Sequence, residues 1–254
     1  MSKIVIGRQF CGPPNSGNGG YVCGVLAKDL EGPATSVLRA PVPLDTPLVF
    51  ERRDGAVVMT GVEGQLIGQG APSAGAELPE TPPAPSLAAA RAAGQRYVGL
   101  STAFHPICFT CGTERGEGDG LRVFTGRLDG AQPGVVAGVW RPHAQFADDD
   151  GLARTEVIWA ALDCPGYFAW VEKEGRHGAL LGTMTGEVLR RPRAGEETIV
   201  LAWPLARDGR KETAGVALYS AQGELLARAH QVWIVMGPRP PAQPADAAAI
   251  RDRV

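Results

Sequence analysis

The feature that most constrains the fold is a segment that is apolar on nearly every side. Residues 156–170 read EVIWAALDCPGYFAW, within a helix expected over residues 153–170. A helix on a protein surface carries polar residues along one face, so a helix that is apolar all round must be enclosed. Strand-like runs follow it, at residues 180–190, 198–204, 213–219 and 224–235. The sequence therefore predicts a helix wrapped by an antiparallel sheet.

The N-terminal part of the chain repeats this organisation. A helix is expected over residues 19–30, and strand-like runs follow at residues 35–39, 48–52, 56–60 and 65–70. Further strands are expected at residues 121–125 and 135–140, before the second helix. Three short motifs, at residues 37–41, 53–55 and 64–67, recur in the same order at residues 188–192, 207–209 and 223–226. Recurrence in order indicates an internal duplication.

A segment rich in proline and alanine separates the two parts. It defines an N-terminal unit over residues 1–71, a linker over residues 72–96 and a C-terminal unit over residues 97–237. The linker lacks apolar periodicity, so we expect it to cross the surface without pairing in either sheet. Residues 238–254 have the same composition and are expected to form a frayed tail or a short docking helix.

Composition and charge exclude several classes of function. The formal net charge is −2, from 25 lysine and arginine residues against 27 aspartate and glutamate residues. This balance offers no basic field for nucleic acid and no polybasic anchor for a membrane. No apolar run approaches the roughly 18–20 residues that span a bilayer. An odd count of five cysteines suits a reducing compartment, so we expect a cytoplasmic protein that binds neither nucleic acid nor membranes.

Two of the cysteines have the CxxC spacing that is typical of half a zinc site or of a redox pair. These are Cys108 and Cys111. The chain has no second CxxC and no His-x3–5-His that would complete a metal site, and Cys11, Cys23 and Cys164 are scattered. The sequence therefore predicts packing roles for Cys108 and Cys111, with no metal and no cofactor.

Three segments carry a resemblance to a known family. Residues 188–196, after the second helix, resemble the strand and turn of hotdog-fold acyl-CoA thioesterases, and Asn18-Gly19-Gly20 resembles the His-Gly-Gly that opens their central helix. Residues 108–112, with Gly120-Leu121, resemble an entry segment of phenylacetate-type thioesterases. With the duplication, the chain resembles medium-chain acyl-CoA thioesterases with a double hotdog. The implied fold is α+β, a tandem hotdog in which an antiparallel sheet wraps two central helices.

The resemblance implies a catalytic arrangement divided between the two units. Thioester hydrolysis needs a carboxylate that activates water, and a helix N-terminus whose N–H groups stabilise the oxyanion. Here Asp163 is the candidate base, and Asn18, Gly19 and Gly20 form the candidate oxyanion end. Ala27 takes the place of the acid on the first helix. The resemblance thus implies one competent site, at the interface between the units.

The second helix lacks the other half of such a site. Arg154 stands nine residues before Asp163, and no glycine pair follows it. Asp163 is also unusual without any family, because an acid inside an apolar run must be paired, hydrogen-bonded or shifted in pKa if it is buried. The alternative is that Pro165-Gly166 breaks the helix and leaves Asp163 at a solvated end.

Supporting side chains come from the sheet in the double-hotdog type. Gln231 lies in the last strand, where the family has a glutamine, although it could instead face outward. The family's threonine corresponds to Thr183 or Thr185, which share a face of their strand, and we favour Thr183. Arg190 and Arg191, with Arg193, are candidates for binding the phosphates of CoA.

Acyl-CoA hydrolysis is therefore the expected activity. The expected partner is acyl-CoA or a related thioester, and a homo-oligomer of such double units is compatible with the resemblance. One alternative is a hotdog protein that binds acyl-CoA without turnover. A second, an enoyl-thioester hydratase, is disfavoured because no Asp-x-Asn-Pro-x-His motif occurs, and the lack of G-x-S-x-G argues against an α/β-hydrolase.

Overall fold

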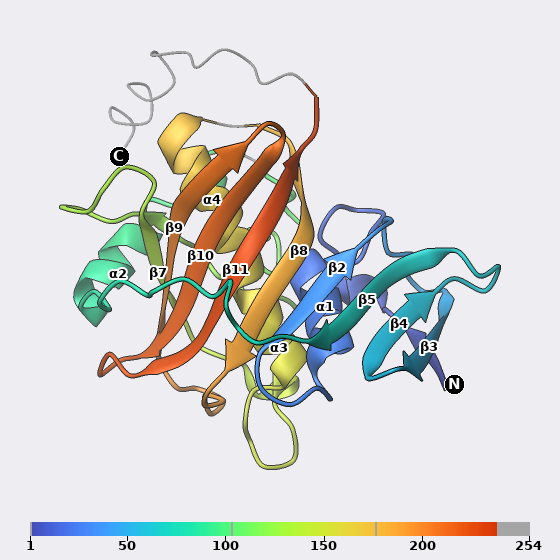
Figure 1. The fold of residues 1–254 in the computed structure, drawn as a ribbon. Coiled ribbons are helices and arrows are strands. Elements are labelled where there is room, and N and C mark those ends of the chain that lie inside the picture. Colours follow the sequence, from blue (N-terminus) through green and yellow to red (C-terminus); the bar gives the residue numbers. More distant parts are fainter. Residues whose placement is uncertain (1, 103, 176, 238–254) are drawn as a thin grey trace.

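An antiparallel sheet organises the molecule (Figure 1). The computed structural model describes residues 2–102, 104–175 and 177–237. The eleven strands are β1 Ser2–Val5, β2 Ala34–Leu38, β3 Pro47–Arg53, β4 Ala56–Thr60, β5 Leu66–Pro72, β6 Gly126–Arg127, β7 Val136–Trp140, β8 Ala179–Val188, β9 Thr198–Asp208, β10 Lys211–Ser220 and β11 Leu225–Val235. Their order across the sheet is β1-β3-β4-β5-β2-β8-β11-β10-β9-β7-β6. The predicted tail, residues 238–254, lies outside the described residues.

Strands β2 and β8 join the N-terminal and C-terminal parts of the sheet. They pair in antiparallel register, with Ala34 opposite Gly186 and Val37 opposite Thr183. Each of these strands follows helical structure in the sequence. The sheet is therefore continuous and antiparallel, as the sequence predicted.

The helices cover both faces of the sheet. They are α1 Gly19–Ala27, α2 Leu87–Gly94, α3 Thr155–Ala161 and α4 Asp163–Glu174, with short 3₁₀ helices at Arg8–Phe10, Val98–Leu100 and Ala144–Phe146. Helices α1, α3 and α4 lie on the inner face, which the sheet curves around (Figure 1). No helix among the described residues is both long enough and apolar enough to cross a membrane.

Two glycines allow α1 to lie unusually close to α3 and α4. A Cβ atom at Gly24 would lie 2.5 Å from the Cα of Glu156 and 2.8 Å from the Cβ of Trp159. A Cβ atom at Gly20 would lie 2.5 Å from the Cβ of Asp163 and 2.6 Å from the carbonyl oxygen of Trp159. Real Cβ atoms do not make such contacts, so only glycine permits this approach.

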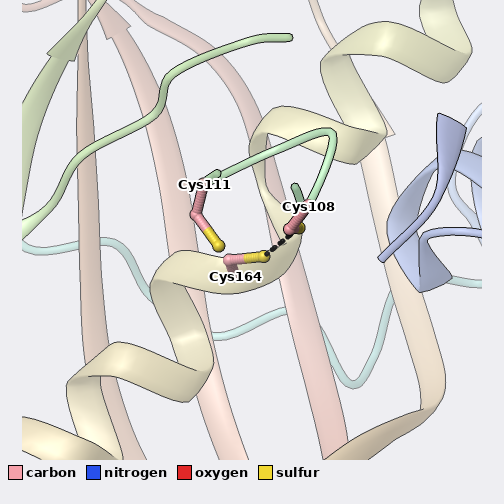
Figure 2. A group of neighbouring side chains, drawn as sticks. All are labelled: Cys108, Cys111 and Cys164. Atoms are coloured by element: carbon pink, nitrogen blue, oxygen red, sulfur yellow. Dashed lines mark hydrogen bonds between the residues drawn. The ribbon is translucent and has the colours of Figure 1, made fainter. Parts of the chain in front are cut away.

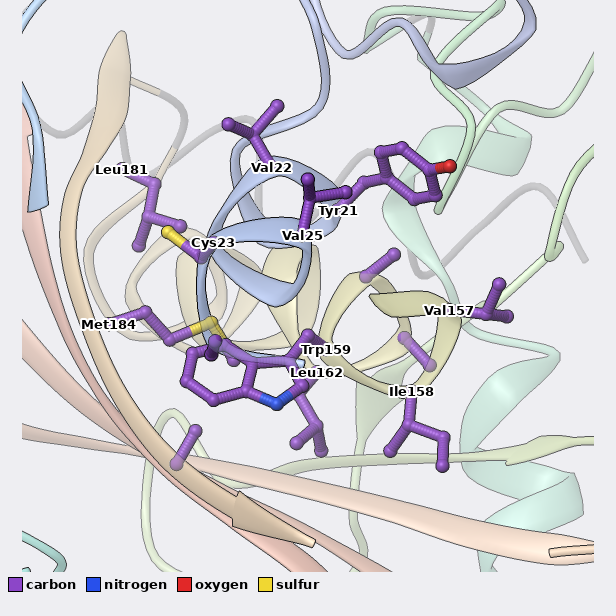
Figure 3. Close-up of a cluster of buried hydrophobic side chains, with 14 of the residues drawn as sticks. Tyr21, Val22, Cys23, Val25, Val157, Ile158, Trp159, Leu162, Leu181 and Met184 are labelled. Atoms are coloured by element: carbon purple, nitrogen blue, oxygen red, sulfur yellow. The ribbon is translucent and has the colours of Figure 1, made fainter. Parts of the chain in front are cut away.

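Apolar side chains fill the space between this helix pair and the sheet. Trp159 and Leu162 pack beside α1, and Leu181 and Met184 of β8 point toward the same helix (Figure 3). All four side chains are buried. This packing agrees with the expectation that an all-round apolar helix must be enclosed.

Part of the linker is a helix that covers the outer face of the sheet. Helix α2 starts at the cap residue Ser86, whose Oγ accepts a hydrogen bond from the N–H of Ala89. Ala90 and Ala93 are buried in a second apolar cluster, whose other members are Ala137, Ile199, Leu201, Trp203, Ala217 and Tyr219. The linker expected over residues 72–96 contributes only its first residue to a strand, because Pro72 pairs with Ala34 at the end of β5. The helix in its last part was not predicted from the sequence. Small alanines let this helix pack flat on the sheet.

The prediction of a strand over residues 121–125 was wrong. Its backbone pairs with the loop before it, since the N–H of Leu121 donates to the carbonyl of Phe109 and the N–H of Val123 donates to that of Thr110. Arg122 adopts a left-handed φ of 54°, which a regular strand does not allow. This segment therefore extends the loop that begins near Cys108.

The second helix breaks where Pro165 was expected to disturb it. Helix α3 ends at Ala161, and α4 begins at Asp163. Pro165 has no N–H to donate to the carbonyl of Ala161, so the helical ladder is interrupted there. Asp163 is nevertheless buried, which excludes the alternative of a solvated helix end.

Replacing Gly24 with alanine tests the close contact between the helices. We expect a loss of about 1–3 kcal/mol in the free energy of unfolding, because the new methyl group overpacks against Glu156. In an exposed helix the same change gains roughly 1 kcal/mol. Denaturant titration measures the difference, and Gly116→Ala in an open loop is the control. A Gly24→Ala protein as stable as the wild type would contradict the packing described here.

Candidate active site

The carboxylate of Asp163 lies against the N-terminus of α1, only 3% exposed. Its Oδ2 accepts hydrogen bonds from the side-chain Nδ2 of Asn18, at 2.8 Å, and from the backbone N–H of Gly20, at 3.0 Å. Its Oδ1 is buried and has no hydrogen-bond partner among the described residues. Burial raises the pKa of Asp163 to about 7, and the hydrogen bonds from Gly20 and Asn18 oppose this shift. One carboxylate oxygen is therefore fixed and the other is left without a partner.

Asn18 both caps α1 and holds this carboxylate. Its Oδ1 accepts a hydrogen bond from the N–H of Tyr21 at 2.9 Å, and its backbone N–H donates to the carbonyl of Phe10. The hydrogen bond from Tyr21 orients the side-chain amide, and its Nδ2 is directed at Asp163. The positive end of the helix dipole also faces the carboxylate. The structure thus brings Asn18, Gly20 and Asp163 together, from opposite parts of the chain.

Gln231 supports the backbone of Asp163 and does not contact its carboxylate. Its Nε2 donates to the carbonyls of Leu162, at 2.6 Å, and Asp163, at 2.9 Å, and its Oε1 accepts from the Nε1 of Trp233 at 2.8 Å. Gln231 is buried and faces the helices, which excludes the outward-facing alternative. It supplies donors to carbonyls at the break that Pro165 creates.

The candidate threonines lie on the other face of the sheet. The Oγ1 of Thr185 lies 2.8 Å from the Oγ1 of Thr35 on β2. The neighbouring Ser36 donates to the carbonyl of Cys23 in α1, so Ser36 faces the helix and Thr35 faces away from it. Thr183 is two residues from Thr185 in the same strand and shares its face. The structure does not bring Thr183 to Asp163.

The arginine candidates lie at the opposite end of α1. Arg190 forms ion pairs with Glu196 and Glu224, and Arg191 forms one with Asp148. Both arginines line a cavity of about 440 Å³ whose walls also include Ala27, Lys28, Thr155 and Trp159. This cavity lies between the C-terminal end of α1 and the start of α3, where the sequence hypothesis of a duplication would place a counterpart of the Asp163 site without an acid. A second cavity of about 740 Å³ lies near α2, and Asp163 lines neither.

Sequence reasoning missed a second group of polar side chains beside the carboxylate. The Nδ2 of Asn18 lies 3.9 Å from the Sγ of Cys108, and the Sγ atoms of Cys108 and Cys164 lie 3.7 Å apart. The only signal in the sequence was that Cys164 directly follows Asp163. The scattered cysteine and the CxxC pair therefore meet at the candidate site.

No family model and no curated protein matches this sequence. Solved structures, in contrast, match along nearly the whole chain. A protein of unknown function with a hot dog fold, from Alicyclobacillus acidocaldarius, is 15% identical with a TM-score of 0.58, and the match covers 93% of each chain. The chain has a hot dog fold.

Two further neighbours are described as thioesterases. One, from Novosphingobium aromaticivorans, is 14% identical with a TM-score of 0.58, and the match covers 92% of this chain and 95% of that one. The other, described as a thioesterase II from Thermobifida fusca, is 16% identical with a TM-score of 0.55 and 92% coverage of both chains. These neighbours confirm the resemblance seen in the sequence at the level of the fold.

Replacing Gln231 with methionine tests its support of the helix break. The change leaves the carbonyls of Leu162 and Asp163 without their donor and the indole of Trp233 without its acceptor. Each buried unsatisfied group costs about 1–3 kcal/mol, so we expect a loss of roughly 3 kcal/mol or more in unfolding free energy. Gln222→Met, in an exposed turn, is the matched control. Equal stability of the two variants in a denaturant titration would contradict the role.

Proposed function

We propose that this chain hydrolyses acyl thioesters such as acyl-CoA, with Asp163 as the general base. The observation that carries the proposal is the carboxylate held by Asn18 and Gly20 at the N-terminus of α1, with one oxygen left without a partner among the described residues. A fixed base next to a helix N-terminus is what this hydrolysis requires. Two neighbours of the same fold that are described as thioesterases support this chemistry.

In the proposed reaction, the unpartnered Oδ1 of Asp163 takes a proton from a water molecule as that water attacks the thioester carbon. Negative charge develops on the thioester oxygen, which the N-terminus of α1 stabilises. The N–H of Gly20 already donates to Asp163 and that of Tyr21 to Asn18, so the N–H of Gly19 is the donor we assign to the oxyanion. The carbon–sulfur bond then breaks, and the leaving thiolate takes the proton back from Asp163.

Substrate entry in this proposal requires a side chain to move. A Cβ atom at Gly19 would lie 3.1 Å from both Cβ and Cδ2 of Leu181, so this leucine covers the start of α1. Leu181 has flexible χ angles and lies at the edge of the core, 8% exposed. Its displacement would open the side of Gly19 that faces β8, which is the route we propose for an acyl thioester to the N-terminus of α1.

We also propose that the chain is a double hotdog that arose by duplication. Support comes from the antiparallel junction of β2 and β8, each of which follows helical structure, and from the recurring motifs in the sequence. In this arrangement the N-terminal unit supplies Asn18, Gly19 and Gly20, and the C-terminal unit supplies Asp163. One unit alone would lack a complete site.

Replacing Asp163 with asparagine tests the base. A single oxygen of Asp163 accepts both hydrogen bonds, so the amide oxygen of asparagine can keep them and the fold should persist. The amide cannot take a proton from water, and we expect thiol release from acyl-CoA to fall about 10²-fold or more. The measurement is a thiol-release assay over a panel of acyl-CoA substrates.

Glu156→Gln is the matched control for this experiment. Glu156 is a buried acid of α3, upstream of Asp163, and we expect its replacement to leave thiol release within a few-fold of wild type. Near-normal hydrolysis by Asp163→Asn would overturn the assignment of the base. Wild-type protein that releases no thiol from any substrate would overturn hydrolysis itself.

Binding of acyl-CoA without turnover is the second candidate. It is favoured by one observation, namely that the cavity lined by Arg190, Arg191 and Thr155 does not include Asp163. Arg190 and Arg191 could pair with CoA phosphates there, while Ala27 supplies no base. Calorimetric binding of acyl-CoA by the wild type, with no thiol release and weaker binding by Arg191→Ala, would support this function over hydrolysis.

A further inference from the structure

Three cysteine side chains converge on one point beside the candidate active site. Cys108 and Cys111 come from the loop before residue 121, and Cys164 comes from the first turn of α4 (Figure 2). The three Sγ atoms lie within 4.8 Å of one another, and those of Cys108 and Cys164 are 3.7 Å apart. All three are buried. No other group of three such side chains in the described part of the chain has this geometry.

The loop that carries two of these thiols is a tight turn that brings their sulfur atoms close together. The N–H of Gly112 donates to the carbonyl of Cys108 at 2.8 Å, which closes the turn. A Cβ atom at Gly112 would lie 2.5 Å from the carbonyl oxygens of Pro106 and Cys108, so only glycine fits there. The glycine that follows the CxxC pair is therefore a requirement of this turn, which points both thiols to the same side.

Polar donors face the sulfur of Cys108. The Nδ2 of Asn18 donates to it at 3.9 Å, and the nearby backbone N–H groups of Thr110 and Cys111 lower the pKa of the thiol. Hydrogen bonds to sulfur favour the thiolate, the form of cysteine that binds metals. A cysteine that merely fills apolar space has no need of these donors.

The spacing of the sulfurs suits one particular class of ion. Zinc binds cysteine sulfur at about 2.3 Å in a tetrahedral arrangement, which places two bound sulfurs roughly 3.8 Å apart. Cys108 and Cys164 already have this separation, and Cys111 reaches it with a small side-chain movement. Three thiolates and a divalent ion leave a fourth position, which a water molecule or another small ligand can fill.

We propose that Cys108, Cys111 and Cys164 bind one thiophilic metal ion, Zn²⁺, as a three-cysteine site. Each thiol that binds the ion releases its proton to solvent, and no change in oxidation state is involved. The ion would tie the loop to the first turn of α4, directly beside Asp163. The site stands independently of hydrolysis, because its ligands and its test do not involve a thioester.

A competing arrangement of the same thiols is a disulfide. The Sγ atoms of Cys108 and Cys164 are close enough for a disulfide to form after a small movement. A disulfide uses only two cysteines, however, and leaves the third unpaired. The metal site accounts for the convergence of all three. The two arrangements differ in the number of free thiols that the metal-free protein contains.

The test uses the whole 254-residue chain and two probe ions. Metal analysis of protein made in zinc-supplemented medium should give one zinc per chain, and Co²⁺ added to the metal-free protein should give the sulfur-to-cobalt charge-transfer band of a thiolate site. Cys108→Ala and Cys164→Ala should lose both signals. Cys11→Ala and Cys23→Ala, at buried cysteines outside the cluster, should keep them.

A second measurement keeps the test decisive if the variants fold poorly. Zn²⁺ should protect Cys108, Cys111 and Cys164 of the wild type from alkylation, located by peptide mass spectrometry, while protection of Cys11 and Cys23 stays unchanged. Wild-type protein that binds neither ion would overturn the proposal. So would a metal-free protein purified without reductant in which two of the three thiols have formed a disulfide that Zn²⁺ cannot replace.

Discussion

The close contact between α1 and the α3–α4 pair is the constraint on which the rest of the structure depends. Because Gly20 and Gly24 have no side chains, the two helical segments meet backbone to backbone inside the sheet. The same contact holds the backbone N of Gly20 3.0 Å from the Oδ2 of Asp163. A bulkier residue at either glycine would separate the helices, enlarge the space that the sheet must enclose and pull the carboxylate from its donors.

Much of the sheet could be predicted from the sequence, because its strands alternate between the helix side and the outer side. The two elements that the sequence did not predict correctly have a common cause. Residues 121–125 alternate like a strand, but their backbone hydrogen bonds go to the loop that carries Cys108. The alanines of α2 show no amphipathic pattern, yet small side chains are what allow that helix to lie on the sheet. Partners far away in the sequence decided both outcomes.

The candidate site was predictable where its chemistry is unusual and unpredictable where it depends on register. Two features can be recognised from the sequence alone. One is an acid inside an apolar helix, Asp163, and the other is a glycine pair at the start of a helix. Thr183 is placed by the pairing of β8 with β2, which sequence patterns do not fix. Cys164 looked isolated because its partners lie in another segment. The break at Pro165 brings both Asp163 and Cys164 to the first turn of α4.

The ends of the sheet carry a consequence for how copies of this chain can assemble. The strands at its two edges are β1, with four residues, and β6, with two. Free N–H and C=O groups on an edge strand are what another strand would pair with, and short edges offer few of them. Helix α2 also covers outer-face residues of β7, β9 and β10. Lateral extension of the sheet is therefore disfavoured, and a second copy would have to associate through side-chain surfaces.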